Sequence, residues 1–326
     1  MSTETTAGQS TGQIIELSSV NPEINQGLWH LALRRLRRDY LTIIAIVVVL
    51  ALALLSLLAP VISKNILHVD YTRTSRTTYA GIDTEGHILG TDDIGRDYFA
   101  RLLYGGRVSI GIAFTAAIFS LVIGVSVGLI AGFYHGGRLR FIDDFVMWFI
   151  TTLNSIPTLY LLITLVAVLN GRSGSGGVGS SISLSVLSLI LILGFLGWTG
   201  TTRLVRGEAL SQREREYVMA ARVMGANDLR IMFVHILPNV FSIIIVTLAI
   251  DIGALILVES TLSYLGLGVQ EPVPSWGNML TDAKSYYGKG NHLIGLPAVL
   301  VTVTVLCLYL IGDGLRDAID PETVRR

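Results

Sequence analysis

Six long apolar runs constrain this chain more than any other feature of its sequence. A helix of about 20 apolar residues is long enough to cross the hydrocarbon core of a bilayer and satisfies its own backbone polar groups there. None of the runs alternates polar and apolar residues as a barrel strand would. We therefore predict an all-α membrane protein with six transmembrane helices, at residues 41–62, 108–133, 145–169, 182–202, 240–258 and 292–312.

The overall composition agrees with a membrane location. Of the 326 residues, 51% are hydrophobic and 15% are charged, whereas a soluble domain typically carries about 25% charged residues. The lipid bilayer is thus an expected partner. The net charge of zero gives no indication of a nucleic-acid partner. The single cysteine, Cys307, lies in the last apolar run, which excludes an intrachain disulfide.

The N-terminal region predicts a membrane anchor rather than a cleaved signal peptide. Residues 1–25 are polar and expected to be disordered, and a basic amphipathic stretch then reaches residue 40. The apolar run at 41–62 is too long for the centre of a signal peptide. We expect residues 1–40 to form a cytoplasmic segment and 41–62 to form the first transmembrane helix.

The distribution of Lys and Arg indicates the orientation of the helices. If the N-terminus is inside, the segments at 170–181 and 259–291 are external, and they hold only Arg172, Lys284 and Lys289. Positive charge then gathers in the internal segments, as the positive-inside rule requires. We discount the predicted external loop at 63–107, because long loops report orientation poorly. Both termini, including the tail at 315–326, are predicted to be cytoplasmic.

A charge-rich, helix-prone segment at 204–239 separates the fourth and fifth runs. Good helix formers extend from Gln212 to Val223, and Gly225 then fits a helix C-cap. Asn227 or Asp228 can cap a second helix, expected to reach Leu237. Small and apolar residues near the turn favour docking in a partner's groove, whereas the alternative is an amphipathic hairpin lying on the lipid headgroups. The candidate contact residues are Met219, Ala220, Ala221, Val223, Met224, Gly225, Ala226, Leu237 and Pro238.

This segment resembles the "EAA" loop of ABC importer permeases. Ala220 and Ala221 are followed by three residues, Gly225, nine more residues and then HILP. Residues 87–114, 259–280 and 312–321 also resemble segments of the "C" subunit of oligopeptide and dipeptide permeases of the peptide/nickel family. Two departures lie in the loop, where Met219 replaces the glutamate and His235 an isoleucine. Trp148 and Thr151 stand where the family often has Arg and Asp.

The resemblance implies a type I ABC importer permease fold, with a five-helix domain at 108–314, in a prokaryotic cell membrane. It implies as partners a second homologous permease, two ABC ATPase subunits and an extracytoplasmic substrate-binding protein. The chain has no GxxxxGK[ST] phosphate loop, so ATP and Mg are expected on the ATPase subunits and no cofactor on this chain. The implied substrates are di- and oligopeptides; a nickel chelate, glutathione or an oligosaccharide is an alternative. A secondary transporter would need repeats and midplane ion sites, and a non-transporting scaffold would need only the docking loop.

Two carboxylates are candidates for a pore or gate. Asp251 lies inside the fifth run and Glu259 lies near its outer end. A carboxylate at membrane depth is expected to face a cavity or a partner, so Asp251 either lines the pore or bonds to a neighbouring helix. No His, Cys, Asp or Glu spacing predicts a metal site.

Four further patterns give structural predictions. The spacing Gly124-xxx-Gly128-xxx-Gly132 predicts close helix packing. The charges at 92–101 predict an external salt-bridged collar or part of a binding-protein platform. Trp276, Tyr286 and Tyr287 fit an aromatic belt at the membrane interface. The GxGxxG match at 174–179 lacks a preceding strand and is interpreted as an external hairpin.

Overall fold

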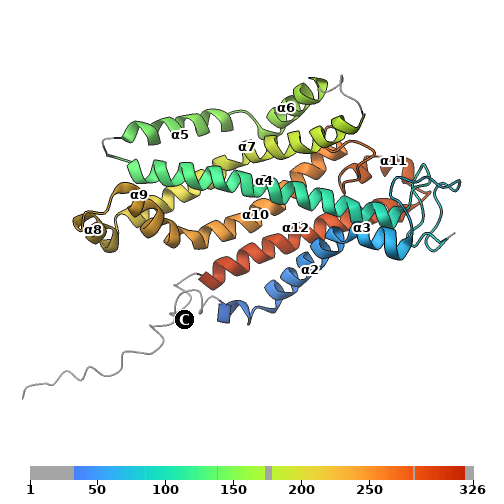
Figure 1. The fold of residues 1–326 in the computed structure, drawn as a ribbon, viewed down its shortest axis with the longest axis horizontal. Helices are drawn as coiled ribbons and strands as arrows, with labels where there is room; N and C mark the ends of the chain where they lie inside the picture. Colours follow the sequence, from blue (N-terminus) through green and yellow to red (C-terminus); the bar gives the residue numbers. More distant parts are fainter. Residues whose placement is uncertain (1–32, 85, 138, 173–177, 282, 320–326) are drawn as a thin grey trace, which may run out of the picture.

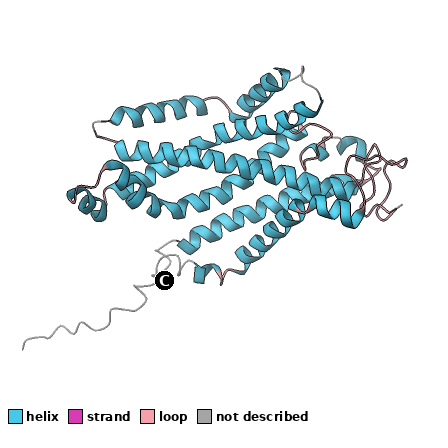
Figure 2. Cartoon of the chain, viewed as in Figure 1, coloured by secondary structure: helices cyan, strands magenta, loops and turns pink. Residues whose placement is uncertain are grey.

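The computed structural model describes residues 33–84, 86–137, 139–172, 178–281 and 283–319. The prediction of disorder at 1–25, the first four residues of the hairpin predicted at 174–179 and most of the predicted tail lie outside these residues, while Val178 and Gly179 begin a helix. The described part is helical, with isolated β-bridges only (Figure 2). The helices are α2 (Tyr40–Leu57), α3 (Ala59–Val61), η2 (Ile62–Leu67), α4 (Tyr98–Tyr134), α5 (Arg140–Asn154), α6 (Thr158–Arg172), α7 (Val178–Arg213), α8 (Glu216–Val223), α9 (Asp228–Arg230), η4 (Ile231–Ile236), α10 (Leu237–Tyr264), η5 (Asn278–Leu280), α11 (Ala283–Tyr286) and α12 (Asn291–Ile319).

Five of the described helical segments are long and apolar enough to cross a membrane. They contain α2, α4, α7, α10 and α12, which match five of the six predicted runs. The third predicted run, 145–169, differs because it is divided between α5 and α6, whose axes differ in direction by 83°. Pro157 lies at the break, and proline disfavours helical backbone in the residue before it. Counting the bent pair as one span gives six spans.

Several helix ends differ from the predicted boundaries, and α7, for example, reaches Arg213 rather than 202. Helix α4 begins at Tyr98 rather than at 108, because the Asp97 side chain accepts a hydrogen bond from the Ala100 N–H and caps the helix. Helix α2 ends at Leu57, and the chain continues through short α3 and the π-helix η2 to Leu67. Among the described residues, the irregular part of the predicted loop at 63–107 is therefore limited to 68–84 and 86–97.

The glycine pattern in α4 forms its interface with α7, as predicted. A methyl group added at Gly124 would lie 2.7 Å from the Thr201 Cβ. One added at Gly128 would lie 2.7 Å from the carbonyl oxygen of Thr202, and one at Gly132 would meet Arg206 at the same distance. Only glycine allows the two backbones to approach this closely.

The long helices run side by side, and the loops gather at the two ends of the bundle (Figure 1). Helix α4 packs against α7, α10, α2 and α5, while α12 packs between α10 and α2. Helices α5 and α6 lie along one edge. The loop at 68–97 and α11 lie at one end, and α8 and α9 lie at the opposite end. The predicted docking loop is thus separated from the predicted external loops by the length of the bundle.

Candidate partner interface

A tight turn joins α8 to α9 and shapes the tip of the docking loop. Gly225 has φ of +83°, a conformation that costs glycine little. The Ala226 N–H donates to the Ala221 carbonyl at 3.0 Å and the Gly225 N–H to that of Arg222 at 3.0 Å, which is a Schellman arrangement. Asn227 then caps the next helix, because its side chain accepts from the Arg230 N–H at 2.9 Å. The predicted capping roles of Gly225, at the end of α8, and of Asn227, before α9, are confirmed.

The inner face of α8 is anchored in an apolar cluster. Val218 and Ala221 are buried, and they belong to or adjoin a core formed by the ends of α4, α7 and α10 together with η4. Its buried members are Leu129, Phe133, Val205, Ala209, Val218, Ile231, Met232, Ile236, Val240 and Ile244. This packing holds α8 against the end of the bundle.

The outer side of the turn is apolar and open. Val223 is 88% exposed, Met224 is 81% exposed and Met219 is 53% exposed. We call these three residues the α8 ridge. Among the other predicted contact residues, Ala220, Gly225 and Pro238 are exposed, Ala226 and Leu237 are partly buried, and Ala221 is buried. Exposed apolar side chains that lie together in this way are typical of a surface that a partner protein or a membrane covers.

Side-chain contacts connect the loop to three long helices. The Tyr217 hydroxyl donates to Gln212 Oε1 at 2.7 Å and accepts from Asn239 Nδ2 at 3.3 Å, which joins α8 to the ends of α7 and α10. Arg222 lies 5.9 Å from the centre of the Phe133 ring, and the Tyr134 hydroxyl donates to Asp228 at 3.4 Å. Helices α8 and α9 are therefore in direct side-chain contact with α4, α7 and α10.

The local helices differ from the predicted ones in two places. The helix predicted from Gln212 to Val223 is interrupted, because α7 ends at Arg213 and α8 begins at Glu216. The second helix is short α9 followed by η4, which continues into α10 without the predicted break before Pro238. Pro238 lies in the first turn of α10, directly after η4.

A charged cluster beside the loop was not found from the sequence. Asp143 of α5 is buried and accepts hydrogen bonds from Arg206 of α7, one of them at 2.7 Å to Nη2. His135, after α4, lies 2.7 Å from Asp143 Oδ2. These residues are far apart in sequence, and only the apposition of α4, α5 and α7 brings them together. Trp148 stands where the family that the sequence resembles often has a charged residue, and it is exposed on α5.

The two carboxylates of α10 have different surroundings. Asp251 is partly buried, and its Oδ2 accepts a hydrogen bond from the Thr201 hydroxyl of α7 at 3.1 Å. This contact corresponds to the helix-bonding alternative for Asp251. Glu259 is fully buried, with Ser263 donating to its Oε1 at 2.7 Å. Its second oxygen, Oε2, is buried and has no hydrogen-bond partner within the described residues.

The charges at 92–101, which we predict to be external, form ion pairs, as the collar interpretation predicts. Buried Asp92 accepts from Arg96 at 2.6 Å, and Arg101 lies 3.6 Å from the same carboxylate. Both arginines also reach Glu271 in the segment between α10 and α12, Arg101 at 2.7 Å. Burial of Glu271 opposes its ionisation, but the hydrogen bonds and charges of Arg101 and Arg96 outweigh that effect and lower the pKa of its carboxyl. The residues near Glu271 in the sequence did not indicate that it pairs with Arg96 and Arg101.

The aromatic-belt prediction is wrong for Trp276. Its ring is 1% exposed, and Nε1 donates to the Leu102 carbonyl at 3.0 Å. Trp276 therefore packs the segment between α10 and α12 onto α4. Tyr286 is also buried, and only Tyr287 is exposed. Among the described residues, no group of three or more His, Cys, Asp and Glu side chains is placed to hold a metal ion.

Comparison with solved structures defines the class of this bundle. The chain is similar to "Inward facing conformations of the MetNI methionine ABC transporter" in two crystal forms, with TM-scores of 0.50 and 0.51 at 20% identity. These matches cover 66% and 68% of this chain and 94% and 96% of the other. The fold is that of a type I ABC importer permease.

Sequence comparisons then identify the family. The family described as "Binding-protein-dependent transport system inner membrane component" matches residues 124–325, and "N-terminal TM domain of oligopeptide transport permease C" matches residues 27–79. The chain belongs to this family of binding-protein-dependent permeases, and it is a membrane-spanning transport protein.

Named relatives cover nearly the whole chain. "Dipeptide transport system permease protein DppC" of Alkalihalophilus pseudofirmus is 33% identical over 90% of each chain. "Oligopeptide transport system permease protein OppC" of Bacillus subtilis is 35% identical, also over 90% of each. "Glutathione transport system permease protein GsiD" of Pectobacterium atrosepticum is 35% identical over 90% of this chain and 91% of the relative.

Proposed function

We propose that this chain is one of two permease subunits that form the membrane pathway of an ATP-driven importer of di- and oligopeptides. The names of the dipeptide and oligopeptide relatives support the substrate class. Glutathione is the second candidate, because GsiD is equally similar in identity and coverage. Glutathione is itself a peptide, so one pathway chemistry serves both proposals.

The observation that carries the proposal is the exposed α8 ridge at one end of the bundle (Figure 1). We assign this end to the cytoplasm on the basis of the Lys and Arg distribution, with both termini on the same side. The ridge and its neighbours from Ala220 to Ala226, with Leu237 and Pro238, form the proposed surface for an ABC ATPase subunit. ATP and Mg bind to that subunit and its copy, and this chain binds no cofactor.

The contacts around α8 support a mechanical role for the loop. In this proposal, ATP binding draws the two ATPase subunits together, and they carry α8 with them. The movement passes through Tyr217, Arg222 and Asp228 into α4, α7 and α10 and turns the pathway outward. An extracytoplasmic binding protein then delivers the peptide, and ATP hydrolysis returns the pathway to the inside. We keep Asp251 as a candidate pathway residue, although its carboxylate accepts a hydrogen bond from Thr201 of α7.

Reconstitution tests this function directly. We expect proteoliposomes containing both permeases, the ATPases and the binding protein to accumulate a radiolabelled tripeptide when ATP is supplied to the cytoplasmic side. Unlabelled dipeptides and glutathione serve as competitors that separate the two substrate proposals. Accumulation that continues without ATP would support a secondary transporter instead. ATPase binding without any peptide accumulation would support the scaffold.

A further inference from the structure

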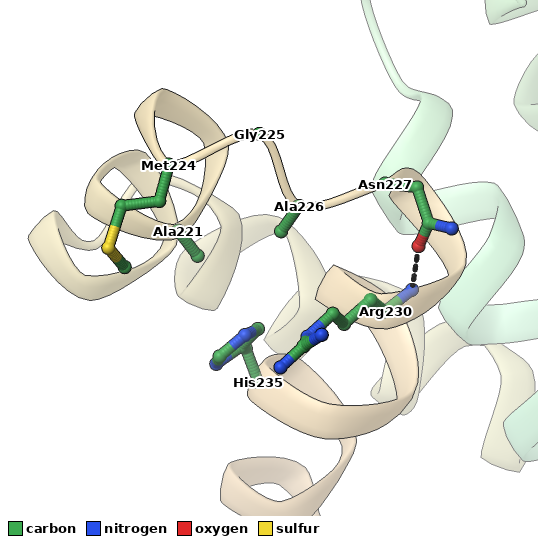
Figure 3. Close-up of a pocket in the computed structure, with 7 residues that line it drawn as sticks. All are labelled: Ala221, Met224, Gly225, Ala226, Asn227, Arg230 and His235. Carbon is green, nitrogen blue, oxygen red and sulfur yellow. Dashed lines mark hydrogen bonds between the residues drawn. The ribbon is translucent and has the colours of Figure 1, made fainter.

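An open hollow lies beside the turn at the tip of the docking loop. Its volume is about 410 Å³, and Figure 3 shows its lining: Ala221, Met224, Gly225, Ala226, Asn227, Arg230 and His235. Met224 belongs both to this lining and to the α8 ridge. A partner that covers the ridge therefore also reaches the hollow.

Two basic side chains enter this hollow without partners. Arg230 and His235 lie beside one another below the turn (Figure 3). The backbone N–H of Arg230 is used by the Asn227 cap, but neither the guanidinium nor the His235 ring has a hydrogen-bond or ion-pair partner within the described residues. The neighbouring acid, Asp228, is bonded to Tyr134 and is not part of the lining. The hollow thus contains a guanidinium that forms no ion pair within the described residues.

The remaining walls fit a short side chain that ends in a carboxylate. Ala221 and Ala226 provide small apolar surfaces, and Gly225 has no side chain to narrow the entrance. A methyl group added at Gly225 would meet nothing within 4 Å. An aliphatic stem can pack on the alanines and Met224, while the planar guanidinium offers two parallel N–H donors to a carboxylate.

We propose that the hollow receives an aspartate or glutamate side chain of the ATPase subunit, whose carboxylate pairs with Arg230 and accepts a hydrogen bond from His235. This inference rests on the proposed function, which makes the α8 ridge the ATPase-facing surface. A lipid phosphate has related chemistry. We favour a protein partner, because the hollow shares Met224 with the α8 ridge, which is the proposed ATPase-facing surface.

Charge reversal in the assembled transporter tests the pairing. With the complex purified through a tag on this chain, we expect Arg230→Glu to weaken binding of the ATPase subunits at least about tenfold, since it places like charges together. Arg230→Gln should weaken it less. The matched control is Arg140→Glu, because Arg140 is exposed and already paired with Asp144 at 3.1 Å. A lysine scan of the acidic residues of the ATPase in the Arg230→Glu background should find one position that restores binding.

Several outcomes would overturn the proposal. One is unchanged ATPase binding by Arg230→Glu, and another is a loss that no acidic-to-lysine change in the ATPase restores. A loss seen in vesicles with phosphatidylglycerol but not in vesicles of phosphatidylcholine alone would assign the hollow to a lipid headgroup. If Arg230→Glu does not fold, Arg230→Gln must still weaken binding more than the control does.

Failure of this inference can be told apart from failure of the proposed function. Disulfide or chemical cross-linking from Val223→Cys reports whether the ridge meets the ATPase at all, in a chain that keeps Arg230. If that cross-link forms and Arg230→Glu binds normally, only the carboxylate pairing is wrong. If it never forms, the ATPase-facing surface itself is wrong.

Discussion

Replacement of Gly128 by alanine is expected to loosen the contact between α4 and α7. The new Cβ would lie 2.7 Å from the Thr202 carbonyl oxygen and 3.0 Å from the Val205 Cβ. Ordinary contacts of this kind are about 3.5–4.0 Å long, so the helices must separate by roughly 0.8 Å or more at this point. The main obstacle is backbone, which no change of rotamer removes. Overpacking of this kind costs about 1–3 kcal/mol.

The same helix supplies a matched control for the general effect of replacing glycine. A methyl group at Gly111 of α4 would meet nothing within 4 Å. Gly111→Ala should therefore show only the gain of about 0.5–1 kcal/mol that alanine brings to a helix interior. We expect the two variants to differ by about 1–3 kcal/mol, with Gly128→Ala less stable. Thermal unfolding of both purified variants in the same detergent, followed by tryptophan fluorescence, measures the order. Equal Tm values would refute the close-packing argument.

Three further variants test separate parts of the structure. Glu271→Gln should lower the Tm at neutral pH, because the pKa of Glu271 is lowered in the folded state. The difference in Tm between the variant and the parent should be constant above the ordinary carboxyl pKa of about 4.3. It should disappear as the pH falls through the lower pKa of the folded state. Thr201→Val removes the donor to Asp251 and should cost about 1–3 kcal/mol in detergent unfolding; an unchanged unfolding curve would show that this bond contributes nothing. Gly225→Val should reduce peptide-stimulated ATP hydrolysis in the reconstituted complex more than Gly225→Asn does, since a side chain at φ of +83° costs about 1–2 kcal/mol and asparagine tolerates it best; equal stimulation would contradict a role for the turn.

Local sequence signals predicted most of the helices and the turn of the docking loop. The apolar runs placed five of the spanning helices, and Gly225 and Asn227 placed the turn because glycine and asparagine carry specific backbone requirements. The glycine spacing in α4 located the contact face with α7. Each of these signals is contained in a few neighbouring residues.

Features that depend on contacts between distant segments could not be predicted from local sequence signals. The effect of Pro157 was not predicted, because proline is tolerated in membrane helices when neighbours satisfy the freed groups. The pairing of Asp143 with Arg206, and of Glu271 with Arg96 and Arg101, needs helices that are far apart in sequence. Burial of Trp276 likewise depends on where the external segment packs. The empty hollow at Arg230 becomes visible only when α8 and η4 are placed together.

The central claim is that the α8 ridge is a cytoplasmic binding surface for a separate ATPase subunit. Site-directed cross-linking tests this claim most directly. Val223 is 88% exposed, and the only native cysteine, Cys307, is buried. With Val223→Cys in intact cells, we predict no modification by a membrane-impermeant maleimide added outside and efficient cross-linking to an ATP-hydrolysing subunit from inside. Labelling from outside, or cross-linking to no such subunit in the assembled transporter, would contradict the account.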